Sequence, residues 1–227
     1  MTAHLFAVCF AAQQPQRLAQ FWSGLLGWEQ AGDASLLPAD DTGFRIRFVA
    51  TDEPKTSQNR AHFDLTSGSS AEQQQTVARA LDLGGRHTDV GQRPDERHVV
   101  LADPEGNEFC VIEPGNKFLA ECGFVGALAG DGSQEVGYFW SAALDWPLVW
   151  DQNEETGIRS PQGGPKFTWG GPPLMPRSGP DRVWFDLAAD RDEVDRLVSL
   201  GATLVDTRAD EASLTDPDGN RFRVLNR

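Results

Sequence analysis

The sequence predicts an α+β fold in which one module is present twice in tandem. A turn motif, D-P-E-G-N-E-F at 103–109, returns as D-P-D-G-N-R-F at 216–222. A helical motif, F-W-S-G-L-L-G-W at 21–28, returns as F-W-S-A-A-L-D-W at 139–146. Proline and glycine suit a tight turn, and each turn leads into a short apolar strand. Two motifs repeated in the same order indicate a duplicated unit.

The first half reads as two successive β-α-β-β-β cycles, because stretches with strand periodicity follow each helical stretch. An apolar stripe predicts the first helix, and Gly27 suits its end. The expected elements are strands at 5–11, 34–37, 44–49, 61–65, 86–89, 97–102 and 108–113, and helices at 16–26 and 71–83.

The second half restarts the same pattern after a linker at 113–117, which predicts two units, 1–115 and 119–227. Residues 156–179 are rich in glycine and proline, so we expect mostly loop around one short strand there. The expected elements are strands at 123–129, 166–169, 183–187 and 221–225, and helices around 139–146 and at 192–200.

Composition narrows the class of protein and its partners. The chain has 227 residues and a formal net charge of -14, so nucleic acid is not an expected partner. Its three cysteines lack C-x-x-C spacing, and buried free thiols suit a reducing compartment. No apolar run reaches the length of a membrane span. We therefore expect a cytoplasmic protein with no membrane partner.

The repeated motifs resemble the vicinal oxygen chelate superfamily, and most of all its glyoxalase-like and bleomycin-resistance-like proteins. The stretch E-P-K-x-x-x-N-R-x-H-x-D-L at 53–65 adds to the likeness. The resemblance implies the glyoxalase/bleomycin resistance/dihydroxybiphenyl dioxygenase fold. In that fold tandem βαβββ repeats form two cupped mixed sheets, with helices on their outer faces and a ligand in each cup. It also implies a monomeric pseudo-dimer or a homodimer.

Enzymes of the superfamily usually hold a divalent ion at fixed positions on the inner strands. Placed on this sequence, those positions are Ala7, Val49, His62, Cys110, Val125, Thr168, Trp184 and Arg223. Whether a cup forms within one module or by exchange between modules stays open. In either case these positions supply fewer than the three protein ligands of a catalytic metal site. We therefore expect no metal cofactor, the alternative being a divalent metal with ligands at other positions.

Strand alternation predicts which side chains line the cups. Phe6, Val8 and Phe10 are expected to face the helices, which leaves the small residues between them to face a cup. The candidate ligand-binding residues are Arg47, His62, Asp64, Cys110, Trp184, Asp186 and Arg223. A tryptophan can stack on a planar ligand and an arginine can bind a carboxylate, so an aromatic or anionic small molecule is the expected partner. The alternative is that these charges pair with one another and that Trp184 belongs to the core.

Three functions remain open on the sequence. The leading prediction is metal-independent binding of a small molecule, of the sequestration or resistance type. The second is an enzyme, a lyase, isomerase or dioxygenase, either metal-dependent or using His62 and Asp64 as an acid–base pair. A strand histidine satisfied by its neighbour is the simpler explanation of that pair. The third is a rigid platform for a protein partner.

Overall fold

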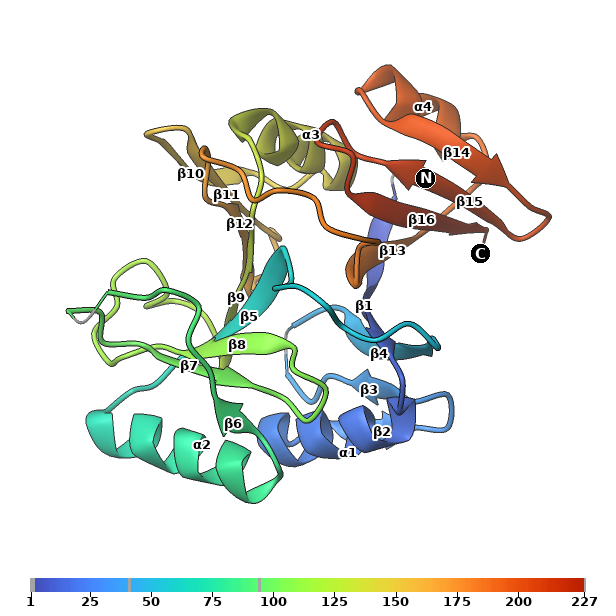
Figure 1. The fold of residues 1–227 in the computed structure, drawn as a ribbon. Coiled ribbons are helices and arrows are strands. Elements are labelled where there is room, and N and C mark those ends of the chain that lie inside the picture. The colour runs from blue at the N-terminus through green and yellow to red at the C-terminus, as the bar shows by residue number, and fades with distance from the viewer. Residues whose placement is uncertain (1–2, 41, 94, 227) are drawn as a thin grey trace.

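The computed structural model describes residues 3–40, 42–93 and 95–226. The strands form two sheets, and four helices accompany them (Figure 1). The strands are β1 (His4–Ala12), β2 (Glu29–Ala31), β3 (Ser35–Leu37), β4 (Arg45–Ala50), β5 (Ala61–Leu65), β6 (Arg86–His87), β7 (Val99–Ala102), β8 (Glu108–Val111), β9 (Val125–Gly130), β10 (Leu148–Gln152), β11 (Glu155–Arg159), β12 (Lys166–Trp169), β13 (Val183–Ala189), β14 (Thr203–Thr207), β15 (Glu211–Thr215) and β16 (Arg221–Asn226). The helices are α1 (Pro15–Leu26), α2 (Ser70–Asp82), α3 (Gln134–Leu144) and α4 (Glu193–Ser199).

Each sheet joins four strands from the first half of the chain to four from the second. Sheet A has the order β14-β15-β16-β13-β1-β4-β3-β2, and sheet B has the order β10-β11-β12-β9-β5-β8-β7-β6. The halves meet in antiparallel pairs, with Val8 opposite Phe185 in sheet A and Phe63 opposite Leu128 in sheet B. Both cups are therefore built by exchange between the halves. The division into units 1–115 and 119–227 stays a prediction.

One hydrophobic core lies behind both cups. Apolar residues on the convex faces of the two sheets pack with the inner faces of all four helices in a single buried cluster. Phe10 of sheet A lies 5.6 Å, between ring centroids, from Phe63 of sheet B, and Phe44 lies 5.6 Å from Phe167. The expected α+β fold of two cupped sheets with outer helices is confirmed.

Hydrogen bonds between the two repeated motifs explain why they recur together. The indole Nε1 of Trp22 donates to the buried carboxylate of Asp103 at 3.1 Å, and Trp140 donates to Asp216 at 3.2 Å. In each half, this hydrogen bond therefore joins the helix of the first cycle to the turn of the second cycle.

The turns also cap the helices. Glu105 accepts the backbone N–H groups of Gln13 and Gln14 at the start of α1. Asp218 accepts the N–H and the hydroxyl of Ser133 at the start of α3. These N–H groups belong to the residues just before each helix, where a carboxylate complements the helix dipole.

Two local expectations were wrong. Phe6 does not face the helices, because a β-bulge between Leu5 and Ala7 shifts it, and it packs beside the small residues of the sheet A cup. Residues 156–159, expected to be loop, belong to strand β11, which forms a hairpin with β10. Asn153 and Glu154 at that hairpin turn both have positive φ, as a type I′ turn requires. No described helix is long and apolar enough to cross a membrane.

Candidate functional site

Four of the seven candidate ligand-binding residues meet on the concave face of sheet A. Trp184 and Asp186 come from β13, Arg223 from the neighbouring strand β16, and Arg47 from β4. Alternation sends their neighbours Phe185, Leu187, Phe222 and Val224 to the opposite face. Ala7 and Cys9 of β1 are small, fully buried residues that form one cluster with Trp184, so the indole ring covers the centre of this face.

Asp186 is the centre of this group. Its fully buried carboxylate accepts hydrogen bonds from Nη1 of Arg47 at 3.1 Å, from Nε and Nη2 of Arg223 at 2.7 and 2.6 Å, and from Nε1 of Trp184 at 3.1 Å. A buried charge needs such partners, and the fork of an arginine supplies two at once. The alternative that these charges pair with one another therefore describes the inner part of the face.

Positive charge nevertheless exceeds negative charge on this face. Arg47 and Arg223 pair with Asp186, and they also approach Asp33 and Glu211, respectively. Two more arginines lie alongside, Arg45 over the ring of Phe6 and Arg221 at 5.9 Å from the ring of Trp184. The four guanidinium groups thus outnumber the three carboxylates that pair with them in the described part of the chain. Glu211 is a partner that the sequence analysis missed, because no motif marks it.

Cys9 is a buried thiol without reactivity on this face. Burial and the nearby carboxylate of Asp186 raise its pKa well above the ordinary value, although Arg223 and Arg47 act in the opposite direction. The thiol therefore stays protonated and serves as a small apolar side chain.

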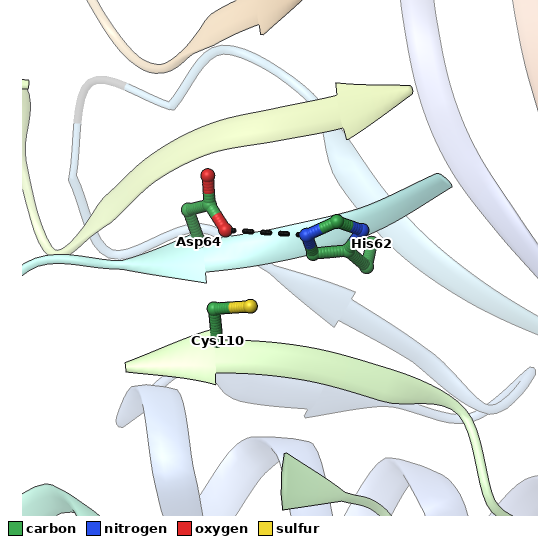
Figure 2. A group of neighbouring side chains, drawn as sticks. All are labelled: His62, Asp64 and Cys110. Carbon is green, nitrogen blue, oxygen red and sulfur yellow. Dashed lines mark ion pairs between the residues drawn. The ribbon is translucent and has the colours of Figure 1, made fainter. Parts of the chain in front are cut away.

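The other three candidates, His62, Asp64 and Cys110, meet on the concave face of sheet B (Figure 2). His62 and Asp64 lie two residues apart on β5, and Cys110 lies opposite Asp64 on the parallel strand β8. His62 Nε2 is 3.4 Å from Asp64 Oδ1, and one donor atom from each of the three residues lies within 4.8 Å of the others. The prediction that His62 and Asp64 share one face is confirmed by this ion pair.

The environment holds the imidazole of His62 in its charged form. Burial opposes the charge, but hydrogen bonds with Asp64 and Cys110 outweigh it and raise the pKa of His62 to about 10. Burial raises the pKa of the Cys110 thiol, and the charge of His62 only partly offsets this. At neutral pH the group is therefore an imidazolium–carboxylate pair beside a neutral thiol.

The segment that follows the linker, residues 118–121, fills part of this second cup. Leu119 is buried against Cys110 and Ala127, and Phe118 packs beside them. Lys166 of β12 donates to the carbonyl of Phe118, and Arg159 of β11 donates to the carbonyl of Glu121 at 2.6 Å. The cup of sheet B is thus narrowed by its own chain, a feature that strand alternation cannot reveal.

The family model for a glyoxalase-like domain matches residues 7–112 and 127–225, which is most of both halves. The chain belongs to the glyoxalase-like domain family. A comparison with the curated proteins found no match to this chain.

Solved structures share this glyoxalase-like fold. Glyoxalase I from Zea mays matches with a TM-score of 0.66 at 12% identity, covering 99% of this chain and 92% of that chain. A protein described as a dioxygenase from Bacillus subtilis subsp. subtilis str. 168 matches with a TM-score of 0.62 at 15% identity, covering 99% and 85%. At these identities the likeness concerns the fold, and it agrees with the vicinal oxygen chelate superfamily.

The metal positions of the superfamily fit this glyoxalase-like chain poorly in sheet A. Ala7, Val49 and Trp184 there offer no ligand atom that a divalent ion prefers, and Arg223 would repel a cation. One placement was wrong, because a β-bulge at Gly126 sends Val125 into the main core. Ala127, opposite Asp64, takes the place in sheet B that Ala7 takes opposite Asp186 in sheet A.

Sheet B offers more than the superfamily positions alone suggest. Thr168 adds no strong ligand, but Asp64 joins His62 and Cys110, so three donors stand together. This number matches the protein ligands of a catalytic zinc site. The donors would have to approach one another to the spacing of about 3.3–3.8 Å that zinc bond lengths require. His62 would also have to lose the proton that Asp64 stabilises, since a metal binds neutral imidazole.

Proposed function

We propose that this glyoxalase-like protein binds a small planar anion on the concave face of sheet A without using a metal ion. The observation that carries the proposal is the pair of guanidinium groups, of Arg47 and Arg223, that the fully buried Asp186 fixes beside Trp184. A preformed guanidinium pair binds a carboxylate or phenolate with little loss of side-chain freedom. The indole ring of Trp184 is buried at 8% exposure, as the core alternative expected, so it would border the ligand with its edge and fix the arginines through Asp186.

Residual exposure of the two arginines supports the same site. The side chain of Arg47 is 26% exposed and that of Arg223 is 15% exposed, while Asp186 is 0% exposed. Asp186 therefore acts as a buried anchor, and the side chains of Arg47 and Arg223 stay partly exposed although Glu211 also lies 3.4 Å from Nη1 of Arg223. Such a site holds its ligand by charge and stacking and needs no covalent step, which suits sequestration of an aromatic or anionic molecule.

The first test is native mass spectrometry of the protein purified from its host. We expect a bound organic anion in the wild type and in His62→Gln, and its loss in Arg47→Gln. Retention in Arg47→Gln together with loss in His62→Gln would move the ligand to sheet B and overturn the proposal. Circular dichroism of both variants checks that neither result reflects unfolding.

A second candidate function rests on the cluster in sheet B. His62, Asp64 and Cys110 supply either an acid–base pair or a three-donor site for a divalent ion, as an enzyme of this superfamily would need. Elemental analysis after purification without added metal tests the second case. Near-stoichiometric zinc, iron, manganese or nickel that disappears in Cys110→Ala would favour the enzyme over the metal-independent binding protein.

A further inference from the structure

A row of neighbouring side chains crosses the concave face of sheet B from β7 to β11. The strand registers give its order as Val100, Cys110, Asp64, Ala127, Lys166 and Arg159. Side chains at such paired positions point to the same face of a sheet. The row therefore contains two members of the candidate cluster, Cys110 and Asp64, and it ends in two cations.

Residues 116–122 lie along this row, and we call them the strap. Leu119 is 5% exposed and belongs to one buried group with Cys110 and Ala127, and Cys122 packs against that group. Cys110 itself is only 7% exposed. The strap therefore covers the thiol end of the candidate cluster.

Two cations at the far end of the row hold the strap in place. Lys166 donates to the carbonyl of Phe118, and its ammonium group lies 4.1 Å from the centre of the Phe118 ring. Arg159 donates to the carbonyl of Glu121 at 2.6 Å. Hydrogen bonds from charged donors are stronger than those between neutral groups. These two side chains are therefore the polar attachments that fasten the strap to sheet B.

The backbone of the strap is bonded to itself and not to a strand. The N–H group of Cys122 donates to the carbonyl of Leu119 at 3.0 Å, whereas in the described part of the chain no backbone hydrogen bond joins residues 116–122 to a strand. Gly115, whose φ is 81°, and Gly123 flank the strap, and a Cβ added to either would meet nothing within 4 Å. A segment with so few backbone attachments, between two unhindered glycines, can open without unfolding its neighbours.

We propose that the strap is a lid that opens over the cup of sheet B while both sheets stay folded. Opening breaks the hydrogen bonds from Lys166 and Arg159 and exposes Leu119 and Cys110, but it leaves every strand pair intact. Cys110 can then join His62 in binding a ligand or a metal ion only while the strap is open. The inference does not depend on the proposed function of sheet A.

The experiment measures how fast two buried thiols of the folded protein react with N-ethylmaleimide, by mass spectrometry of peptides. It uses the full chain with Cys122→Ser, because Cys122 lies in the strap and would itself be labelled. Cys110 reports opening of the strap, and Cys9, which is 0% exposed in the cup of sheet A, reports unfolding of the protein. We expect Cys110 to react at least about tenfold faster than Cys9. Low concentrations of urea should speed the reaction of Cys9 more than that of Cys110, since local opening exposes less surface.

A matched pair of lysine variants tests the attachment. Lys166→Met removes the donor to Phe118 without uncovering Cys110 directly, because β9 and β5 lie between their strands. We expect this variant to speed the reaction of Cys110 about tenfold, the effect of losing one hydrogen bond from a charged donor. Lys117→Met removes an exposed lysine of the strap that makes no hydrogen bond or ion pair with the described residues, and it should leave the rate unchanged.

A third variant separates opening of the strap from unfolding of the protein. Leu214 is 0% exposed on β15 of sheet A, so Leu214→Ala destabilises the folded protein whether the strap is open or closed. We expect Leu214→Ala to speed the reaction of Cys9 and to leave that of Cys110 within about twofold. If Lys166→Met fails to fold, Leu214→Ala and the comparison of the two thiols decide.

Three outcomes would overturn the inference. The first is equal acceleration of Cys110 and Cys9 by urea and by Leu214→Ala, which would mean that Cys110 reacts only when the protein unfolds. The second is the same rate for Cys110 in Lys166→Met and in Lys117→Met, which would mean that Lys166 does not hold the strap. The third is a reaction of Cys110 as fast as in the protein unfolded by urea, which would mean that the strap does not close. Each of these results would leave the proposed function of sheet A standing.

Discussion

Arg223 grips Asp186 through both carboxylate oxygens, with Nε donating to Oδ1 at 2.7 Å and Nη2 donating to Oδ2 at 2.6 Å. The pair lies on adjacent parallel strands, so the contact also fixes the register of β13 and β16 at the floor of the cup. Burial alone would lower the pKa of Arg223, but Asp186 outweighs this and raises it. The guanidinium group of Arg223 therefore stays charged beside Asp186.

Removing Arg223 from its pair with Asp186 should destabilise the protein strongly. Arg223→Met leaves Asp186 buried with only one of its two arginine partners. We expect a loss of about 3–5 kcal/mol in the free energy of unfolding. Arg47→Met removes one hydrogen bond from a more exposed side chain, so its loss should be smaller. Urea unfolding at neutral pH measures both. Equal losses would show that the two arginines support Asp186 to the same degree.

His62 should titrate far above an ordinary histidine. We expect its pKa, read from ring proton shifts in NMR, to be about 10 in the wild type. Asp64→Asn removes the carboxylate, so the value should fall well below about 10, because burial lowers the pKa of His62 and only Cys110 remains to raise it. A wild-type value near 6.5 would show that Asp64 and Cys110 do not stabilise the imidazolium.

The same shift predicts how stability depends on pH. Because the folded pKa lies above the unfolded one, the contribution of His62 is complete below about pH 6.5 and disappears as the pH rises through about 10. His62→Gln should therefore cost stability at about pH 6 and little at about pH 10.5. Urea unfolding of both proteins at the two pH values checks this sign, and an equal loss at both would refute it.

Trp22 and Trp140 should matter for their N–H groups as well as for their size. Trp22→Phe removes the donor to the buried carboxylate of Asp103, whose pKa burial already raises. We expect a loss of about 3–5 kcal/mol, because a hydrogen bond to a charge and part of a buried ring disappear together. Asp103→Asn in the Trp22→Phe background should cost less than it does alone, as thermal unfolding of the double-mutant cycle would show.

A methyl group at Gly137 should be poorly tolerated. An added Cβ would lie 2.0 Å from Oγ1 and 2.4 Å from Cβ of Thr156, so α3 could not keep its distance from β11. We expect Gly137→Ala to destabilise by about 1–3 kcal/mol despite the higher helix propensity of alanine. Gly24→Ala in α1 is the matched control, because there the new methyl meets only the movable end of Leu83. Similar melting temperatures for the two variants would contradict the packing argument.

The repeated motifs were enough to predict the fold, whereas strand alternation misplaced Phe6 and Val125. The motifs recur together because Trp22 with Asp103 and Trp140 with Asp216 form hydrogen bonds within each half. The sequence could not show which candidate residues from the two halves share a cup, because strand pairing between the halves leaves no periodic signal. This pairing brings Arg47 of the first half beside Trp184, Asp186 and Arg223 of the second, whereas His62 and Cys110 meet on the paired strands β5 and β8 of the first half.

Smaller errors also have physical causes. Counting along β9 placed Val125 in a cup, but a bulge at Gly126 shifts the alternation. The β10–β11 hairpin escaped notice because Asn153 and Glu154 adopt its turn without a glycine. Phe118 and Leu119 fill part of the cup of sheet B because the chain crosses the sheet there. Composition does not indicate where this crossing occurs.

The exchanged pairing has a consequence for synthesis on the ribosome. When the first half has emerged, β1 and β5 each still lack the strand that will lie beside them, because β9 begins at residue 125 and β13 at residue 183. The nascent chain therefore carries an open edge on β5 until β9 (Val125–Gly130) has emerged, and an open edge on β1 until β13 (Val183–Ala189) has emerged. On a crowded polysome the same edges are open on neighbouring nascent copies. Strand pairing between chains therefore competes with folding within each chain until the missing strands have been made.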